Sequence, residues 1–272
     1  MAQAFRRSRI ASAVVMILSA VIAVLIWIRD REHPIIVPII ASVLMLAIGW
    51  IAARVLGNLL ASMENTRYLG YLHMELDPDK FLSCYRTVPG RMKPGSADAA
   101  ICRSYLADGY AAKGEYAAAL ETLSEAPPEG NLPLKGLYAL GRASNYLSLG
   151  DIAGADTALS ELDAVIASCQ SSKPELAKNL SQSRDLQLQR RRYLTGKSVD
   201  TKRLEKLFAA AQYNLRRLEI SKLLAMAALR DGRTAEAEKQ LSYLRKNGRK
   251  TDYKRWADCQ SLPEASGEAG RS

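Results

Sequence analysis

The chain has 272 residues, a formal net charge of +10, two histidines and four cysteines. The cysteines are scattered and form no C-x-x-C pair, so the sequence excludes a disulfide scaffold and fits a reducing compartment. The two histidines are far apart in the sequence, which excludes the usual ligand spacing of a zinc site, and we expect no cofactor.

Two uncharged apolar runs, residues 10–28 and 35–53, open the chain. Each run has 19 residues, and as an α-helix rising about 1.5 Å per residue it nearly spans the roughly 30 Å hydrocarbon core of a bilayer. Because a helix satisfies its own backbone polar groups, we predict a transmembrane helical hairpin over residues 10–53, with a polar bend at residues 29–34. A cleaved signal peptide is the alternative for the first run, but no small-residue cleavage site follows it.

Basic residues beside the runs predict the orientation of the hairpin. They are Arg6, Arg7 and Arg9 before the first run, and Arg54 and Arg67 after the second. Lysine and arginine prefer the cytoplasmic flank of a span, so residues 1–9 and the chain after the second run are expected in the cytoplasm. We therefore expect an integral protein of a bacterial plasma membrane with both termini cytoplasmic.

Strong helix formers dominate residues 54–255, with no β-like alternation, so the expected fold class is all-α. No proline lies between Arg54 and Pro78, which predicts one continuous helix from the second run into this segment. In residues 99–128, two apolar stripes at helical spacing flank a break at Gly114, and prolines end the second stripe. This pattern predicts two antiparallel helices joined by a glycine turn.

The same helix pair recurs along the chain. Gly114 and Gly150 are 36 residues apart, as are Gly196 and Gly232. The predicted pairs cover residues 58–88, 99–128, 134–166, 174–212 and 212–246. A helix–turn–helix unit with this period is typical of an α-solenoid, although an irregular helical bundle with chance glycine spacing is the alternative.

The repeats resemble the tetratricopeptide repeat (TPR) family. The matching residues are Leu106, Ala107, Tyr110, Gly114, Glu115, Tyr116, Ala119, Leu123 and Ala126 in the first clear copy, Ala143, Tyr146, Gly150, Asp151, Ala155 and Leu159 in the next, and Leu224, Ala225, Gly232, Ala237 and Leu241 in the last. Arg142 stands where the family has leucine, and the unit around Gly196 keeps little beyond its turn. The resemblance implies a TPR-like α-solenoid over residues 54–255. The small, polar and aperiodic residues 256–272 predict a disordered tail.

In that family, the first helix of each pair lines a concave face that binds protein partners. Alignment on the turn glycines places the corresponding partner-binding positions at Ser104, Tyr105, Asp108, Ala111, Leu140, Ser144, Leu147, Lys222, Met226 and Leu229. The set of Lys, Arg and Asn residues by which some members clamp a terminal carboxylate is absent from these positions, so the resemblance does not imply that ligand.

Basic residues concentrate in the second half of the repeats. Residues 96–172 contain 4 Lys and Arg against 10 Asp and Glu, a net of −6, whereas residues 173–255 contain 22 against 9, a net of +13. We expect a surface for anionic lipid headgroups or an acidic protein at Arg190, Arg191, Arg192, Arg216 and Arg217. A merely solvated face is the alternative, and nucleic acid is not expected because the basic half has few aromatic residues for stacking.

One string in the sequence resembles part of a nucleotide-binding motif. The string Gly196-Lys197-Ser198 resembles the end of a phosphate loop, but Arg191 occupies the position of the required first glycine and a helix precedes it. We therefore predict a simple helix turn there. No serine, cysteine or carboxylate pair lies in a catalytic context, so we do not expect an enzyme.

Two functions of different classes fit these features. The first is a membrane-anchored cytoplasmic adaptor or scaffold that binds a protein partner through its solenoid. The second is an accessory subunit of a multi-subunit membrane complex, for transport, secretion or envelope assembly, whose transmembrane helices contact other subunits. The apolar runs carry no charged residue, so we expect no ion path through this chain itself.

Overall fold

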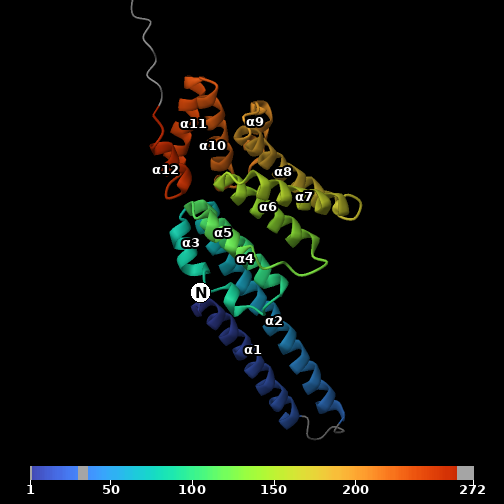
Figure 1. Cartoon of the computed structure of the whole chain (residues 1–272). Coiled ribbons are helices and arrows are strands. Elements are labelled where there is room, and N and C mark those ends of the chain that lie inside the picture. Colours follow the sequence, from blue (N-terminus) through green and yellow to red (C-terminus); the bar gives the residue numbers. More distant parts are fainter. Residues whose placement is uncertain (1, 30–35, 262–272) are drawn as a thin grey trace, which may run out of the picture. The chain divides into compact units, whose positions relative to one another are not determined.

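The computed structural model describes residues 2–29 and 36–261, and every regular element among them is a helix (Figure 1). The chain divides into two units, Met1–Tyr68 and Leu69–Ser272. The predicted all-α fold class is confirmed for the described residues. Most of the predicted polar bend and residues 262–272 of the predicted tail lie outside them.

The first unit contains two long apolar helices. Helix α1 covers Ala2–Arg29 and helix α2 covers Ile36–His73, so the second run continues as one helix, as predicted. Both contain a stretch that is long and apolar enough to cross a membrane, Ile10–Arg29 and Pro38–His73. The most apolar window of each stretch is 11% buried, so neither resembles the buried core helix of a soluble domain.

Polar side chains of small residues join α1 to α2. Ser12 Oγ donates a hydrogen bond to the Ala53 carbonyl oxygen (2.9 Å), and Ser42 Oγ donates to the Ala23 carbonyl oxygen (3.3 Å). Ala23 and Ala53 are buried in this contact, whereas the large apolar side chains of both helices are mostly exposed. Small residues thus let the two backbones approach, and the large ones remain available to lipid.

Replacing Gly49 should separate the two helices. A Cβ atom at Gly49 would lie 2.0 Å from Ser19 Oγ and 2.4 Å from Ser19 Cβ, and rotation of the serine hydroxyl does not relieve the second clash. We expect Gly49→Val to reduce disulfide cross-linking between cysteines placed at positions 23 and 42 by several-fold, in a background without the native cysteines. Ala47→Val is the matched control, because Ala47 is exposed. Equal loss in both variants would contradict the close approach at Gly49.

The second unit consists of successive helices joined by short turns. They are α3 (Pro78–Tyr85), the 3-10 helix η1 (Pro89–Arg91), α4 (Ala97–Lys113), α5 (Tyr116–Thr122), α6 (Leu132–Leu149), α7 (Ile152–Cys169), α8 (Pro174–Leu194), α9 (Thr201–Ala210), α10 (Asn214–Arg230), α11 (Thr234–Asn247) and α12 (Asp252–Asp258). The predicted pairs correspond to the end of α2 with α3, α4 with α5, α6 with α7, α8 with α9, and α10 with α11. The string at residues 196–198 lies in the turn between α8 and α9, as predicted.

The turn residues explain where the helices end and begin. Gly114 and Gly150 end α4 and α6 with φ values of 87° and 77°, in the left-handed region that glycine adopts without steric cost. Asp151 follows Gly150 directly, and its Oδ1 accepts a hydrogen bond from the Gly154 backbone N–H (2.9 Å), which caps α7. One dipeptide therefore ends one helix and starts the next.

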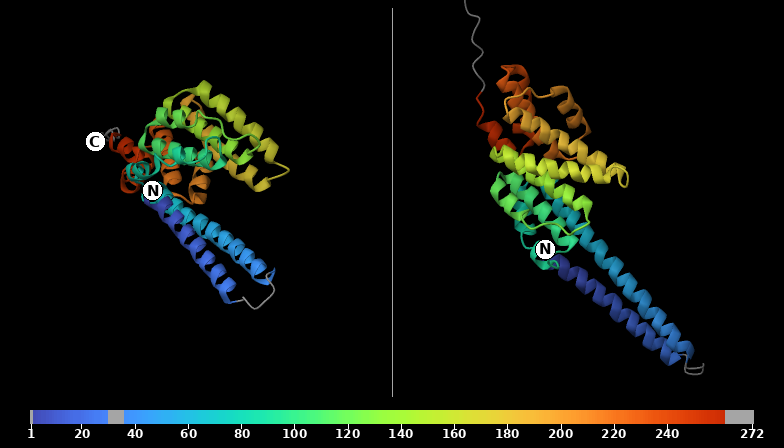
Figure 2. Two further views of the ribbon diagram at one scale, coloured as in Figure 1. Left: turned by 90° about the horizontal axis from the view of Figure 1, so that it is seen from below. Right: turned by 45° about the vertical axis from the view of Figure 1, so that its right-hand side comes forward.

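Helix contacts close the second unit on itself. The first helices of the pairs contact one another in the order α4, α6, α8 and α10. Helix α12 then contacts both α10 and α4, and Figure 2 shows it, in red, beside the N-terminal end of this unit. Among the described residues, the helix pairs thus do not extend as an open-ended row, because the last helix returns to the first clear pair.

Helix α12 corrects the predicted boundary of the tail. The repeat domain was expected to end at residue 255, but α12 runs to Asp258. Ala257 is fully buried, and Trp256 packs against the same apolar cluster, which includes Leu241 and Leu244 of α11. Apolar burial therefore orders a segment whose composition alone predicts disorder.

A larger side chain at Ala119 should strain the α4–α5–α6 core. Ala119 is fully buried in a cluster with Ala107, Leu123 and Tyr138. We expect Ala119→Leu to destabilise the full chain by about 1–3 kcal/mol, measured by thermal unfolding in detergent micelles. The exposed neighbour Ala117 provides the control, since Ala117→Leu should change stability by less than about 0.5 kcal/mol. An equal loss of stability in Ala119→Leu and Ala117→Leu would contradict the repeat register predicted for α5.

Candidate functional site

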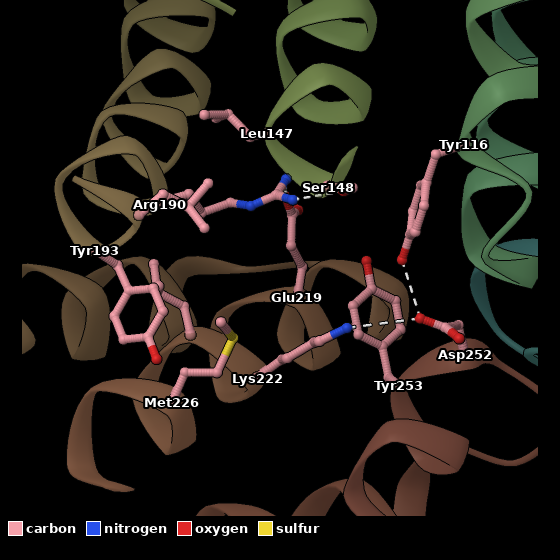
Figure 3. A pocket seen from close by; sticks show the side chains of 12 residues that line it. Tyr116, Leu147, Ser148, Arg190, Tyr193, Glu219, Lys222, Met226, Asp252 and Tyr253 are labelled. Atoms are coloured by element: carbon pink, nitrogen blue, oxygen red, sulfur yellow. Dashed lines mark hydrogen bonds and ion pairs between the residues drawn. The ribbon is translucent and has the colours of Figure 1, made fainter. Parts of the chain in front are cut away.

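The second unit contains a cavity of about 180 Å³ with mixed polar and apolar lining among α5, α6, α8, α10 and α12, which we call the inner cavity (Figure 3). It is lined by Tyr116, Leu147, Ser148, Arg190, Tyr193, Leu194, Glu219, Lys222, Leu223, Met226, Asp252 and Tyr253. Five helices therefore line it, and four of them, α5, α8, α10 and α12, supply its charged and aromatic side chains.

Arg190 of α8 forms the centre of a hydrogen-bond network on one side of the inner cavity. Its guanidinium donates to Ser144 Oγ (2.8 Å) and Ser148 Oγ (2.7 Å) on α6, and to Glu219 Oε1 (3.1 Å) on α10. It also donates to Gln187 Oε1 (3.0 Å) on its own helix. These bonds hold the guanidinium between three helices.

Glu219 is the acceptor that holds this network together. Its Oε1 accepts from Gln187 Nε2 (3.1 Å) as well as from Arg190, and its Oε2 accepts from Arg216 Nη1 (2.8 Å). Burial by itself would raise the pKa of this carboxyl. The Arg216 and Arg190 guanidiniums and the Gln187 amide nevertheless hold the pKa of Glu219 below its ordinary value. Glu219 is thus ionised, and both of its carboxylate oxygens accept hydrogen bonds.

A second ionic group joins α10 to α12 on the opposite side. Lys222 Nζ lies 3.5 Å from Asp252 Oδ2, which also accepts a hydrogen bond from the Tyr116 hydroxyl (2.9 Å). Arg255 lies beside the other oxygen of Asp252 at 3.5 Å, and it donates to the Lys113 carbonyl oxygen. Asp252 therefore connects the last helix to the α4–α5 turn.

Aromatic rings surround the Lys222 ammonium. Its Nζ lies 5.6 Å from the ring centroid of Tyr253 and 5.2 Å from that of Trp256, within the range of cation–π attraction. Burial lowers the pKa of Lys222, and the nearby Asp252 carboxylate opposes this effect. The ammonium is thus held by one long ion pair and two ring faces.

Asp108 is the remaining acid near this network. It lies on α4, is half-buried, and forms no hydrogen bond or ion pair within the described part of the chain. Burial raises the pKa of Asp108 to about 7, and the Glu219 charge adds to the effect. Near neutral pH, the Asp108 carboxyl is therefore partly protonated in the folded chain.

The structure brings together part of the predicted partner-binding set. Leu147, Lys222 and Met226 line the inner cavity, Ser144 accepts from Arg190, and Asp108 interacts with Glu219 through its charge. The other five lie apart from the cavity lining: Ser104 is buried, Tyr105 packs edge-on against Tyr85, Ala111 and Leu140 pack against core clusters, and Leu229 is half-buried.

The five arginines predicted to bind anions do not share one face. Arg190 and Arg216 contact Glu219, Arg191 Nη2 lies 2.7 Å from Asp156 Oδ2, Arg192 Nε donates to the Ser198 carbonyl oxygen, and Arg217 Nε donates to the Ala211 carbonyl oxygen. Each thus has an acceptor within the chain. The surface predicted to bind anions stays a prediction, and Arg190 belongs to the inner cavity.

Sequence reasoning missed eight of the twelve lining residues, among them Tyr116, Glu219, Asp252 and Tyr253. Tyr116 had a packing role in the repeat pattern, and Glu219 was one acid in a basic segment. The signal that points to the last two is the aromatic pair Tyr253 and Trp256 directly after the last repeat, next to an acid. Large aromatic side chains at this spacing favour a packed helix over a tail.

Comparison with protein-family models, with curated proteins and with solved structures finds no match to the chain. The resemblance to the tetratricopeptide repeat family therefore stays a prediction, and the functional proposal depends on the site geometry.

Proposed function

We propose that the chain is a membrane-anchored cytoplasmic adaptor that binds a protein partner through TPR-like helix pairs. Helices α1 and α2 would anchor it in the plasma membrane of a bacterium, with both termini in the cytoplasm. Support for the anchor comes from two apolar helices whose large side chains face outward. A lipid environment would cover this surface, which water does not solvate well.

The observation that carries the binding role is the convergence of first-helix residues on the inner cavity. Leu147, Lys222 and Met226 come from two different pairs and meet beside Leu194, which is 40% exposed. A concave site that combines apolar walls with a few converging polar groups is typical of a binding site. It has room for one side chain of a partner, and the surrounding helix ends would supply further contact.

The adaptor role is tested by purification from membranes. Wild-type chain, a chain whose first 53 residues are replaced by an unrelated two-span anchor, and Met226→Glu are compared for co-purified proteins. We expect the anchor swap to retain the partner and Met226→Glu to lose it. The reverse result, with partner lost only in the anchor swap, would favour the accessory-subunit function instead.

The orientation is tested by cysteine labelling. In a background without native cysteines, a single exposed cysteine at Glu129 should stay unlabelled by a membrane-impermeant maleimide in intact cells and become labelled after lysis. Labelling in intact cells would contradict a cytoplasmic second unit.

A further inference from the structure

Two of the charged groups at the inner cavity already have several partners. The Arg190 guanidinium donates to Ser144, Ser148, Gln187 and Glu219, and both oxygens of Glu219 accept from cationic or amide donors. A ligand at Glu219 would compete with these bonds, and most of the acceptors around Arg190 are already in place. The polar groups with the fewest partners lie on the other side of the cavity.

The other side has donors in excess of acceptors. Lys222 Nζ has one carboxylate partner, Asp252 Oδ2 at 3.5 Å, and that oxygen already accepts from Tyr116 at 2.9 Å. The Tyr253 hydroxyl makes no hydrogen bond to any residue that the structure describes. In Figure 3 the Lys222 ammonium lies beside the Tyr253 ring, so both donors belong to one part of the cavity.

The balance of charged groups around the inner cavity also favours an anionic ligand. The lining holds two cations, Arg190 and Lys222, against the carboxylates of Glu219 and Asp252, and Arg216 and Arg255 contact the same two carboxylates from outside the lining, which makes four cations for two carboxylates. Adding the third acid, Asp108, in its ionised form still leaves an excess of one positive charge. A bound anion would neutralise this excess, whereas a cation would add to it.

The remaining walls are apolar. Leu147, Leu194, Leu223 and Met226 line the cavity together with the Tyr193 ring. Its volume of about 180 Å³ exceeds that of a cavity of about 150 Å³ in another protein, which is known to hold benzene. An apolar body of roughly six to nine non-hydrogen atoms therefore fits against these side chains.

We propose that the inner cavity binds a small amphipathic carboxylate, with its carboxylate on the Lys222 ammonium and the Tyr253 hydroxyl and its apolar body against Leu147, Leu223 and Met226. The carboxylate would belong either to a free organic acid or to the C-terminal apolar residue of the proposed protein partner. This site deepens the proposed adaptor function and rests on it for the second source. It is testable without any partner, so the two can fail separately.

The binding test uses the full chain in lipid nanodiscs and 4-fluorobenzoate as the probe, followed by fluorine NMR. Empty nanodiscs correct for partition into lipid. We expect saturable binding that benzoate displaces and benzyl alcohol does not, because the alcohol lacks the negative charge. Binding of benzyl alcohol as tight as benzoate, or no binding of either, would overturn the proposal.

Variants locate the bound carboxylate. Lys222→Met should weaken binding at least tenfold, since a charged hydrogen bond is lost, and Tyr253→Phe should weaken it several-fold. Lys206→Met on α9 is the control, because this lysine is exposed and remote from the lining. Tyr253→Phe removes a hydroxyl that has no hydrogen-bond partner among the described residues, so it tests the site even if Lys222→Met impairs folding. Unchanged binding in Tyr253→Phe would contradict the assigned position.

Two further experiments test whether the ligand occupies the inner cavity and which molecule supplies its carboxylate. Leu194→Trp should block the cavity from its edge without removing a polar group, and retained binding in this variant would place the ligand elsewhere. A short peptide ending in leucine with a free carboxylate, compared with its amide, reports whether a partner's chain end reaches the site. Binding by the free-carboxylate peptide assigns the site to a partner, and binding by benzoate but not the peptide assigns it to a free acid.

Discussion

Arg190→Met should destabilise the second unit by about 3–5 kcal/mol. The substitution removes the central cation of a network whose side chains are 17% exposed at Arg190 and 15% at Glu219. Glu219 would then remain buried with Arg216 and Gln187 but without its partner on α8. Removing one member of a buried ion pair leaves a poorly compensated charge, and this desolvated charge is the main cost. Pulse proteolysis of the full chain in urea and detergent micelles measures the change.

The neighbouring arginine supplies the control for this prediction. Arg191 also forms an ion pair, with Asp156, but its side chain is 32% exposed and that of Asp156 is 43% exposed. Because water screens such a pair, Arg191→Met should cost less than about 1 kcal/mol. A similar loss for both variants would mean that burial of the Arg190–Glu219 pair does not set its contribution.

The helices of the second unit were predictable from local sequence signals. Gly114 and Gly150 take positive φ values and end helices, and Asp151 caps the helix that follows. Each signal acts over a few residues: a turn glycine, a capping oxygen, or an apolar stripe that repeats every three or four positions. The bounds of the helices therefore follow from the chain without knowledge of their packing.

The closure by α12 was not predictable in this way. The hydrogen bond from Tyr116 to Asp252 joins residues 136 positions apart, and no local pattern specifies such a pairing. Composition also misled, since the last residues are mostly small and polar, and this favoured a tail that begins at residue 256. The burial of Trp256 and Ala257 depends on the clusters of α10 and α11, which exist only once those helices pack.

The basic run at residues 190–192 shows why a charge count does not predict the partner of each side chain. Successive residues of an α-helix point in directions about 100° apart, so three adjacent arginines cannot share one face. Arg190 reaches Glu219 in the inner cavity, Arg191 reaches Asp156 on α7, and Arg192 reaches the backbone of Ser198. The net charge of this segment was correct from sequence, whereas the partner of each side chain needed the tertiary structure.

Asp108→Asn should stabilise the chain at pH 8 by about 2–4 kcal/mol and have little effect at pH 4. Burial raises the pKa of Asp108 to about 7, whereas an unfolded aspartate has a pKa of about 3.9. The folded state therefore binds the proton more tightly, so the stability that this carboxyl permits is full below pH 4 and falls as pH rises to about 7. Above pH 7 the folded chain holds a charged carboxylate near Glu219, without a cation of its own. Asparagine has nearly the same volume and does not ionise, so it removes this cost.

The pH dependence separates this effect from a change in packing. Urea unfolding of the full chain in detergent micelles, at pH 4 and pH 8, gives the difference between Asp108→Asn and wild type at each pH. Asp98→Asn is the control on the same helix: Asp98 is exposed in the first turn of α4, so loss of its charge should destabilise the chain at pH 8 by no more than about 1 kcal/mol and should not stabilise it. A gain for Asp108→Asn that is equal at pH 4 and pH 8 would place its origin in packing, and a loss at pH 8 would show that the Asp108 carboxylate has a stabilising partner in solution.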